Sequence, residues 1–356
     1  MRVPVKLAWI IMILFVLTAG LLRRSHDHIP ESPFLHPLVG NLLFAGIFVL
    51  LLVASRERSA GAVPGRGMRL GSLTPLLLML LIEKWISLGV YEPLFDWFSG
   101  TGLSDVLADA HFRAFAGVGL LATCLLLSRL STPTLRKTWR RVRPSRMPLA
   151  ALQVLAVALG TYLVIGLLST LLGYPLKLRW PTAGALFGWT IAGQALLAFG
   201  EEIYYRGLLY CEIERLAPRM GLRAATAKRW IAVGLTSMLF AMEHMDLTQD
   251  WNVVARQTVF IGCLGALFAL LVAASANIYL AAGIHAWINW LLLGAVPHFA
   301  DATGRPALPA GTYIGVSLIL AFIFAFVFRR RRAPGSARVR QSLQEHRETT
   351  RTLDRA

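Results

Sequence analysis

Three short polar segments interrupt the apolar second half of the chain, and their residue types are those of acid–base chemistry. The first is EEIYYR, residues 201–206. On a helix, Glu202 and Arg206 are one turn apart and can form an ion pair, whereas Glu201 is rotated by about 100° toward a different neighbour. A carboxylate left free in this way can take a proton from a water molecule, as a general base does.

The other two segments carry histidines. FAMEHMD, residues 240–246, places Phe240 and His244 on one helical face, and GIHAWINW, residues 283–290, places His285 and Asn289 one turn apart. An imidazole and a carboxamide on the same stripe can hold a water or stabilise a developing oxyanion. Together the segments hold a proton acceptor and hydrogen-bond donors, as hydrolysis requires.

Composition predicts that these segments lie in a membrane. Hydrophobic residues make up 56% of the 356 residues, charged residues only 15%, and the mean hydropathy is +0.59, which is too apolar for an ordinary soluble protein of this size. Apolar runs long enough to cross about 30 Å of hydrocarbon recur along the chain. We therefore expect an all-α polytopic bundle of about ten transmembrane helices, near residues 5–22, 38–54, 72–91, 112–128, 149–172, 182–210, 230–245, 253–274, 278–296 and 311–328.

The charge distribution gives an orientation. The net charge of +17 arises from 36 basic and 19 acidic residues, and the basic residues concentrate after the second, fourth, sixth and last apolar runs. By the positive-inside rule these loops and both termini are cytoplasmic. No basic face is interleaved with stacking aromatic residues, so nucleic acid is excluded as a partner. The richness in Ala, Leu and Arg favours a bacterial inner membrane as the location.

The chain divides into three parts by composition. Residues 1–147 form N-terminal transmembrane helices of undefined role, residues 148–330 form the core that carries the polar segments, and residues 331–356 form a disordered basic cytoplasmic tail. Three scattered cysteines provide neither a disulfide framework nor a CxxC pair.

The order and spacing of the polar segments resemble a known family. Glu-Glu-x-x-x-Arg, Phe-x-x-x-His and His-x-x-x-Asn on separate predicted helices are similar to the motifs of the CPBP intramembrane proteases, which include the type II CAAX prenyl endopeptidases and the bacteriocin-processing Abi proteins. The resemblance covers roughly residues 180–297, and small residues before the third motif also fit it: Gly262, Gly265, Ala266 and Ala269.

This resemblance implies peptide-bond hydrolysis inside the membrane. It implies that Glu201 activates a water with help from His244, and that His285 and Asn289 bind the water or stabilise the oxyanion. The supporting residues are then Glu202, Arg206 and Phe240, of which Glu202 and Arg206 orient the helix. The expected substrate is a membrane protein or peptide, and the expected water-filled cavity opens toward the cytoplasm or the lipid bilayer.

Several alternatives remain open from the residues alone. His244, His285 and Glu201 are the ligands expected for a catalytic divalent metal such as zinc, but no His-Glu-x-x-His motif is present, which favours glutamate-activated water. Glu202 and Arg206 can equally be a structural ion pair. A proton-coupled transporter lacks its expected internal repeat, and an idle scaffold or immunity protein has no need of a complete set of motif residues.

Overall fold

The computed structural model describes most of the chain between residues 105 and 331 and a few short pieces before it. The described segments are 105–128, 141–174, 187–220, 224–245, 249–300 and 308–331, with the short pieces 2–3, 68–69, 76, 79–80, 138, 177–179 and 222. The predicted spans 5–22 and 38–54, and all but three positions of 72–91, lie outside the described residues. The expected number of ten helices therefore stays a prediction.

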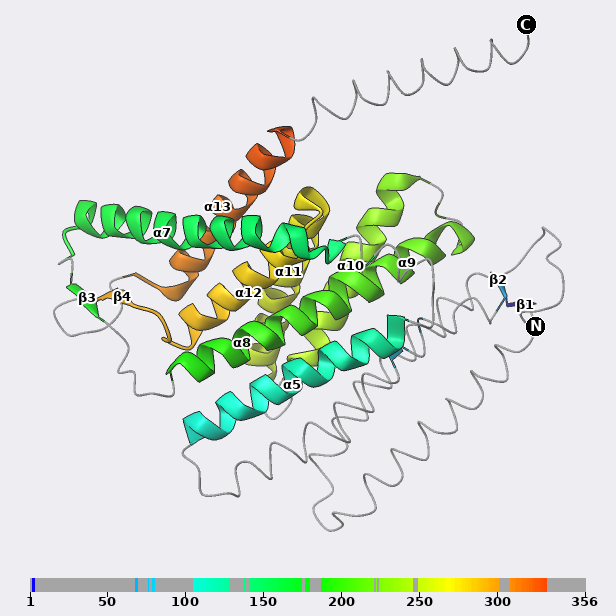
Figure 1. Cartoon of the computed structure of the whole chain (residues 1–356), viewed down its shortest axis with the longest axis horizontal. Helices are drawn as coiled ribbons and strands as arrows, with labels where there is room; N and C mark the ends of the chain where they lie inside the picture. The colour runs from blue at the N-terminus through cyan, green and yellow to red at the C-terminus, as the bar shows by residue number, and fades with distance from the viewer. Residues whose placement is uncertain are drawn as a thin grey trace, which may run out of the picture.

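The described part is helical, with only minimal strands (Figure 1). Every predicted span from the fourth onward has a helical counterpart: α5 (Asp105–Ser128), α7 (Met147–Leu171), α8 (Phe187–Glu202), α9 (Tyr210–Leu216), α10 (Ala225–Glu243), α11 (Trp251–Ser275), α12 (Ile278–Leu292) and α13 (Ala310–Arg331). The strands form two antiparallel pairs, β1 (Arg2–Val3) with β2 (Met68–Arg69) and β3 (Lys177–Arg179) with β4 (His298–Ala300).

Three of the described helices are long and apolar enough to cross a membrane. They are Pro144–Leu171, Trp251–Ser275 and Ala310–Phe328, which correspond to α7, α11 and α13. The helix α12 and the stretch His111–Leu125 of α5 are apolar but shorter. The three spans indicate a multi-pass membrane protein.

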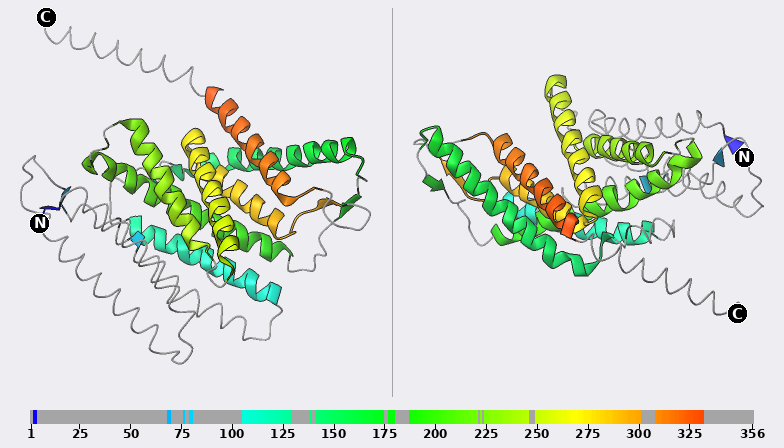
Figure 2. Two further views of the ribbon diagram at one scale, coloured as in Figure 1. Left: turned by 180° about the vertical axis from the view of Figure 1, so that it is seen from behind. Right: turned by 90° about the horizontal axis from the view of Figure 1, so that it is seen from above.

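Helix α7 shows how such a span divides its surface. Its buried polar and apolar positions recur every four residues, and Gln153, Val157 and Ile165 are examples. The opposite face carries leucines such as Leu159 and Leu163, the latter 75% exposed. An apolar face exposed in this way is suited to lipid. The buried face packs against α12 and α13, and α7 and α13 lie next to each other in Figure 2.

Helix α12 lies at the centre of the bundle and contacts α7, α8, α11 and α13. Glycine permits its close contact with α7, since a Cβ on Gly283 would lie 2.5 Å from Val154 Cγ2. The same device joins α5 to α8, which run side by side in Figure 1: a Cβ on Gly117 would lie 2.6 Å from the backbone of Leu196. Small residues at helix contacts are the usual means of packing in membranes, and here they set α12 against α7 and α8 against α5.

Candidate active site

The helix that carries the two glutamates changes its geometry directly after them. Helix α8 ends at Glu202, and residues Ile203–Leu209 form a π-helical segment in which the N–H of Tyr210 donates to the oxygen of Tyr205. The chain then continues in α9, so the predicted span 182–210 extends as an irregular helix to Leu216. Such π segments are rare and occur often at functional sites.

Side chains from the segment before α7 bond to the π segment. Thr138 Oγ1 donates to the oxygen of Gly207 at 2.9 Å, and Arg141 Nη1 donates to the oxygen of Arg206 at 3.0 Å. These two donors pair with backbone oxygens that a regular α-helix would use internally. The absence of a side chain at Gly207 makes room for this contact, because a Cβ there would lie 2.8 Å from Thr138 Cγ2.

Glu202 lies between a cation and an imidazole. The residue is fully buried, and its Oε1 lies 3.1 Å from Arg206 Nη1 and 3.1 Å from His285 Nδ1. The ion pair predicted from the spacing of Glu202 and Arg206 is therefore confirmed. The contact with His285 was not predicted, because it joins two helices and leaves no periodic signal in the sequence.

Glu201 faces the other nitrogen of the same imidazole ring. His285 Nε2 lies 3.5 Å from Glu201 Oε2, and the Glu201 side chain keeps 14% of its surface exposed. When Nδ1 carries a proton, it donates to Glu202, and Nε2 is then directed at Glu201. The two adjacent carboxylates thus have different environments: one is enclosed with a cation, and the other is reachable from outside.

Arg206 is fully buried and has several partners. Its Nη2 donates to the oxygen of Gly265 at 3.1 Å, and its guanidinium lies 4.4 Å from the centroid of the Phe240 ring. The Nη1 contact with Glu202 is an ion pair by distance, but its angles are not those of a hydrogen bond, and Arg206 Nε and Glu202 Oε2 have no hydrogen-bond partner among the described residues. A buried charge held by so few bonds depends strongly on its carboxylate.

Two aromatic rings enclose His285. Phe268 stacks on the imidazole at 4.8 Å with planes 23° apart, and Phe240 meets it edge-on at 5.7 Å. The histidine is itself 4% exposed. These rings and the Glu202 contact restrict the orientation of the imidazole.

His244 stands at the edge of this arrangement. Helix α10 ends at Glu243, so His244 is the residue that follows the helix, whereas the sequence placed it inside a span over 230–245. Its Nδ1 lies 2.8 Å from the oxygen of Phe240, and its ring contacts the Phe240 ring at 4.5 Å. The side chain is exposed. His244 therefore shares the Phe240 ring with His285.

Asn289 bonds to a residue that sequence reasoning did not select. Its amide lies 3.4 Å from the amide of Gln194, which is fully buried on α8. Arg113 on α5 offers only donors, so the Gln194 oxygen faces Arg113, at 2.7 Å from Nη1 and 2.8 Å from Nε. In that orientation the Gln194 nitrogen faces the Asn289 amide, and a hydrogen bond between the two amides requires the Asn289 oxygen to be turned toward Gln194.

The proposed metal ligands were tested against this geometry. Within the described segments, no three His, Cys, Asp or Glu side chains are grouped closely enough to hold an ion. His285 lies near Glu201, but His244 bonds to its own helix. The described residues thus do not fit a three-ligand metal site.

The comparison with known proteins agrees with the motif assignment. Residues 180–291 match the family described as type II CAAX prenyl endopeptidase Rce1-like. No curated protein and no solved structure matches the chain. The matched segment contains α8, the π segment and α12 up to its penultimate residue, and thus all the candidate site residues.

Proposed function

We propose, from the match of residues 180–291 to the Rce1-like type II CAAX prenyl endopeptidase family, that the chain hydrolyses peptide bonds in the membrane by glutamate-activated water. The family implies a peptidase with a protein or peptide substrate. The single observation that carries the mechanism is the placement of Glu201 and Glu202 on opposite nitrogens of one buried imidazole, at 3.5 and 3.1 Å.

Glu201 is the base in this proposal because it is the accessible member of the pair. Its carboxylate takes a proton from a water bound beside His285 Nε2, and the resulting hydroxide forms a bond to the scissile carbonyl carbon. The protonated Glu201 then gives that proton to the departing amine nitrogen as the C–N bond breaks. Glu202 stays ionised beside Arg206 and keeps His285 Nδ1 engaged.

The developing oxyanion needs donors aimed at it. The NH₂ of Asn289 supplies one, oriented through Gln194. The Nδ1 of His244 is turned toward the Phe240 oxygen, which leaves Nε2 available at the exposed edge of the site. From there His244 assists Glu201 in acting on the water and the substrate. Phe240 separates this edge from the buried Arg206 and so supports both histidines.

The substrate in this proposal is a membrane-associated protein or peptide. A CAAX-type prenylated protein is one candidate, because prenyl endopeptidase activity is what the matched family is named for. The proposal requires only that the scissile bond reach Glu201 from the side on which its carboxylate is exposed.

The test compares the peptide termini of the membrane proteome in cells that carry the natural chain, Glu201→Gln, or the control Glu214→Gln. Glu214 is a half-buried glutamate of α9 outside the site, and the same isosteric change there leaves the proposed base intact. We expect specific new termini with the natural chain and the control, and their loss with Glu201→Gln at unchanged membrane abundance. The same termini at the same level in Glu201→Gln would reject Glu201 as the base.

A further inference from the structure

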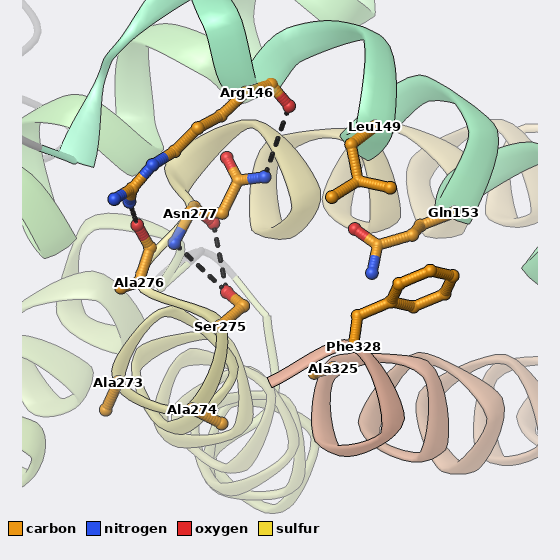
Figure 3. Close-up of a pocket in the computed structure, with 10 residues that line it drawn as sticks. All are labelled: Arg146, Leu149, Gln153, Ala273, Ala274, Ser275, Ala276, Asn277, Ala325 and Phe328. Atoms are coloured by element: carbon orange, nitrogen blue, oxygen red, sulfur yellow. Dashed lines mark hydrogen bonds between the residues drawn. The ribbon is translucent and has the colours of Figure 1, made fainter. Parts of the chain in front are cut away.

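A pocket lies at one end of the bundle, away from the candidate active site, and none of the candidate site residues lines it. Its volume is about 250 Å³, and its walls are the start of α7, the end of α11, the connection Ala276–Asn277 and the end of α13 (Figure 3). The pocket is separate from the candidate active site: Asn277, which caps α12, lines the pocket, whereas His285 lies about two turns further along that helix.

The pocket contains a buried amide without a partner. Gln153 is only 4% exposed, and in Figure 3 its amide points into the cavity. Among the described residues its amide has no hydrogen-bond partner, and it opens into the pocket rather than being sealed in the core. A buried polar group without a partner costs about 1–3 kcal/mol, and a ligand with a hydrogen-bonding atom at this point would remove that cost.

The neighbouring polar groups are already paired. Asn277 caps α12 by accepting from the N–H of Tyr279, and its Nδ2 donates to the oxygen of Arg146 at 3.4 Å. Ser275 Oγ donates to the oxygen of Leu271 at 2.8 Å. Gln153 is thus the polar side chain of this pocket whose hydrogen bonds a ligand would complete.

The other walls are apolar and mostly small. Leu149 and Phe328 face the cavity from α7 and α13, and Ala273 and Ala325 add short side chains (Figure 3). Small side chains leave room beside Leu149 and Phe328, and this apolar part of the wall suits a hydrocarbon chain. The pocket therefore favours a ligand that joins a hydrocarbon chain to a hydrogen-bonding group.

The source of such a ligand follows from the helices that form the pocket. Three of its four walls, α7, α11 and α13, are the three helices that are long and apolar enough to span a membrane. The outer face of α7 carries exposed leucines next to the pocket, among them Leu152 and Leu155. A pocket between membrane-spanning helices is accessible to molecules of the bilayer.

The charges at the rim are positive. Arg146 lines the pocket and donates to the oxygen of Ala276, and Arg143 is exposed three residues earlier. The sequence also places Arg329, Arg330 and Arg331 directly after Phe328. Basic groups at the end of membrane helices attract anionic headgroups. This is also the side that the basic loops predict to be cytoplasmic.

We propose that this pocket binds an anionic glycerophospholipid. One acyl chain lies against Leu149, Ala325 and Phe328, and its ester carbonyl accepts a hydrogen bond from Gln153 Nε2. The phosphate faces the basic rim. The bound lipid fixes the turn between α11 and α12, and this role is independent of the proteolytic function proposed above.

The test uses the full chain in phosphatidylcholine vesicles that contain phosphatidylglycerol with a photoactivatable acyl chain. After illumination, labelled peptides are mapped for the natural chain, Gln153→Leu, and the pocket-filling variants Ala325→Leu and Ala273→Leu. Leu159→Ala, on the outward face of α7, is the matched control. Thermal unfolding of each variant confirms that it is folded, and the two filling variants replace one another if either fails to fold.

We expect labels concentrated in residues 149–153 and 325–328. Each filling variant should remove most of them, Gln153→Leu should lower them about five- to tenfold through loss of one hydrogen bond, and Leu159→Ala should leave them unchanged. Unlabelled phosphatidylglycerol should compete, whereas glycerol 3-phosphate and inorganic phosphate should not. Labels spread along the outward face of α7, persistence in both filling variants, equal labelling by a phosphatidylcholine probe, or competition by free phosphate esters would each overturn the proposal.

Discussion

Arg141 donates a hydrogen bond to the backbone oxygen of Arg206 at 3.0 Å, although 65 residues separate the two arginines. Arg141 lies outside the matched segment 180–291, whereas Arg206 lies inside it. The Arg141 guanidinium also lies 5.0 Å from the centroid of the Tyr210 ring, and Tyr210 directly follows the π segment. The segment before α7 thus contributes directly to the geometry of the helix that carries both glutamates.

The first prediction concerns this contact. Arg141→Met leaves the oxygen of Arg206 without its donor, which should cost about 1–3 kcal/mol of stability and lower proteolysis by loosening the π segment. Arg256→Met, at an exposed position of α11 outside both sites, is the control and should change neither quantity. Unfolding curves and the appearance of cleaved termini measure the two effects. Natural activity in a measurably destabilised Arg141→Met would show that the contact is structural only.

The second prediction separates stability from chemistry in the Glu202–Arg206 pair. Glu202→Gln leaves the guanidinium of Arg206 buried without a counter-charge, and breaking a buried pair in this way costs about 3–5 kcal/mol. The double variant Glu202→Gln with Arg206→Met removes both charges and should recover much of that stability. It should not recover proteolysis, because His285 Nδ1 has then lost its carboxylate. A double-mutant cycle of unfolding free energies measures the coupling, and a coupling near zero would contradict the ion pair.

The third prediction concerns the glycine that faces Arg206. A Cβ on Gly265 would lie 3.2 Å from Arg206 Nη2 and 3.2 Å from Phe240 Cδ1, whereas a Cβ on Gly262 of the same helix would meet Ala241 Cβ at 3.6 Å, an ordinary contact. Gly262→Ala should therefore stabilise the protein by about 0.5–1 kcal/mol through helix propensity. The free energy of unfolding of Gly265→Ala should be about 1–3 kcal/mol lower than that of Gly262→Ala, because the added methyl group overpacks the contact with Arg206 and Phe240. Equal unfolding free energies of the two variants would mean that Arg206 is not held against α11.

These cases show which parts of the site were readable from the sequence. The Glu202–Arg206 pair follows from a spacing of four on one helix, and the structure confirms it. The helices from α7 to α13 follow from apolar runs, and their predicted bounds differ from the observed ones by a few residues at most ends. The small residues before the third motif were noted as part of the family resemblance, and the structure shows that one of them, Gly265, lies against Arg206.

The rest depends on contacts between helices, which leave no period in one sequence. Nothing in the spacing connects Glu202 with His285, 83 residues apart, or Thr138 with Gly207. The π segment was also not predicted, because its residues have the same apolar character as a regular span. His244 was placed inside a helix, since a run that extends to Met245 gives no signal for the end at Glu243.

The last prediction concerns the chain of side chains from Arg113 through Gln194 to Asn289. If Gln194 orients the Asn289 amide, Gln194→Leu should reduce kcat while KM changes little, because the oriented donor acts mainly on the oxyanion of the transition state. Asn289→Ala removes the donor itself and should reduce kcat by about 100-fold or more. The kcat of Gln194→Leu should lie between that of Asn289→Ala and that of the natural chain. The carboxylate of Gln194→Glu can accept hydrogen bonds from Arg113 but, when ionised, cannot donate to Asn289. This variant should therefore have the reduced kcat of Gln194→Leu but a higher free energy of unfolding. A rise in KM with unchanged kcat in Gln194→Leu would instead place this amide in substrate binding.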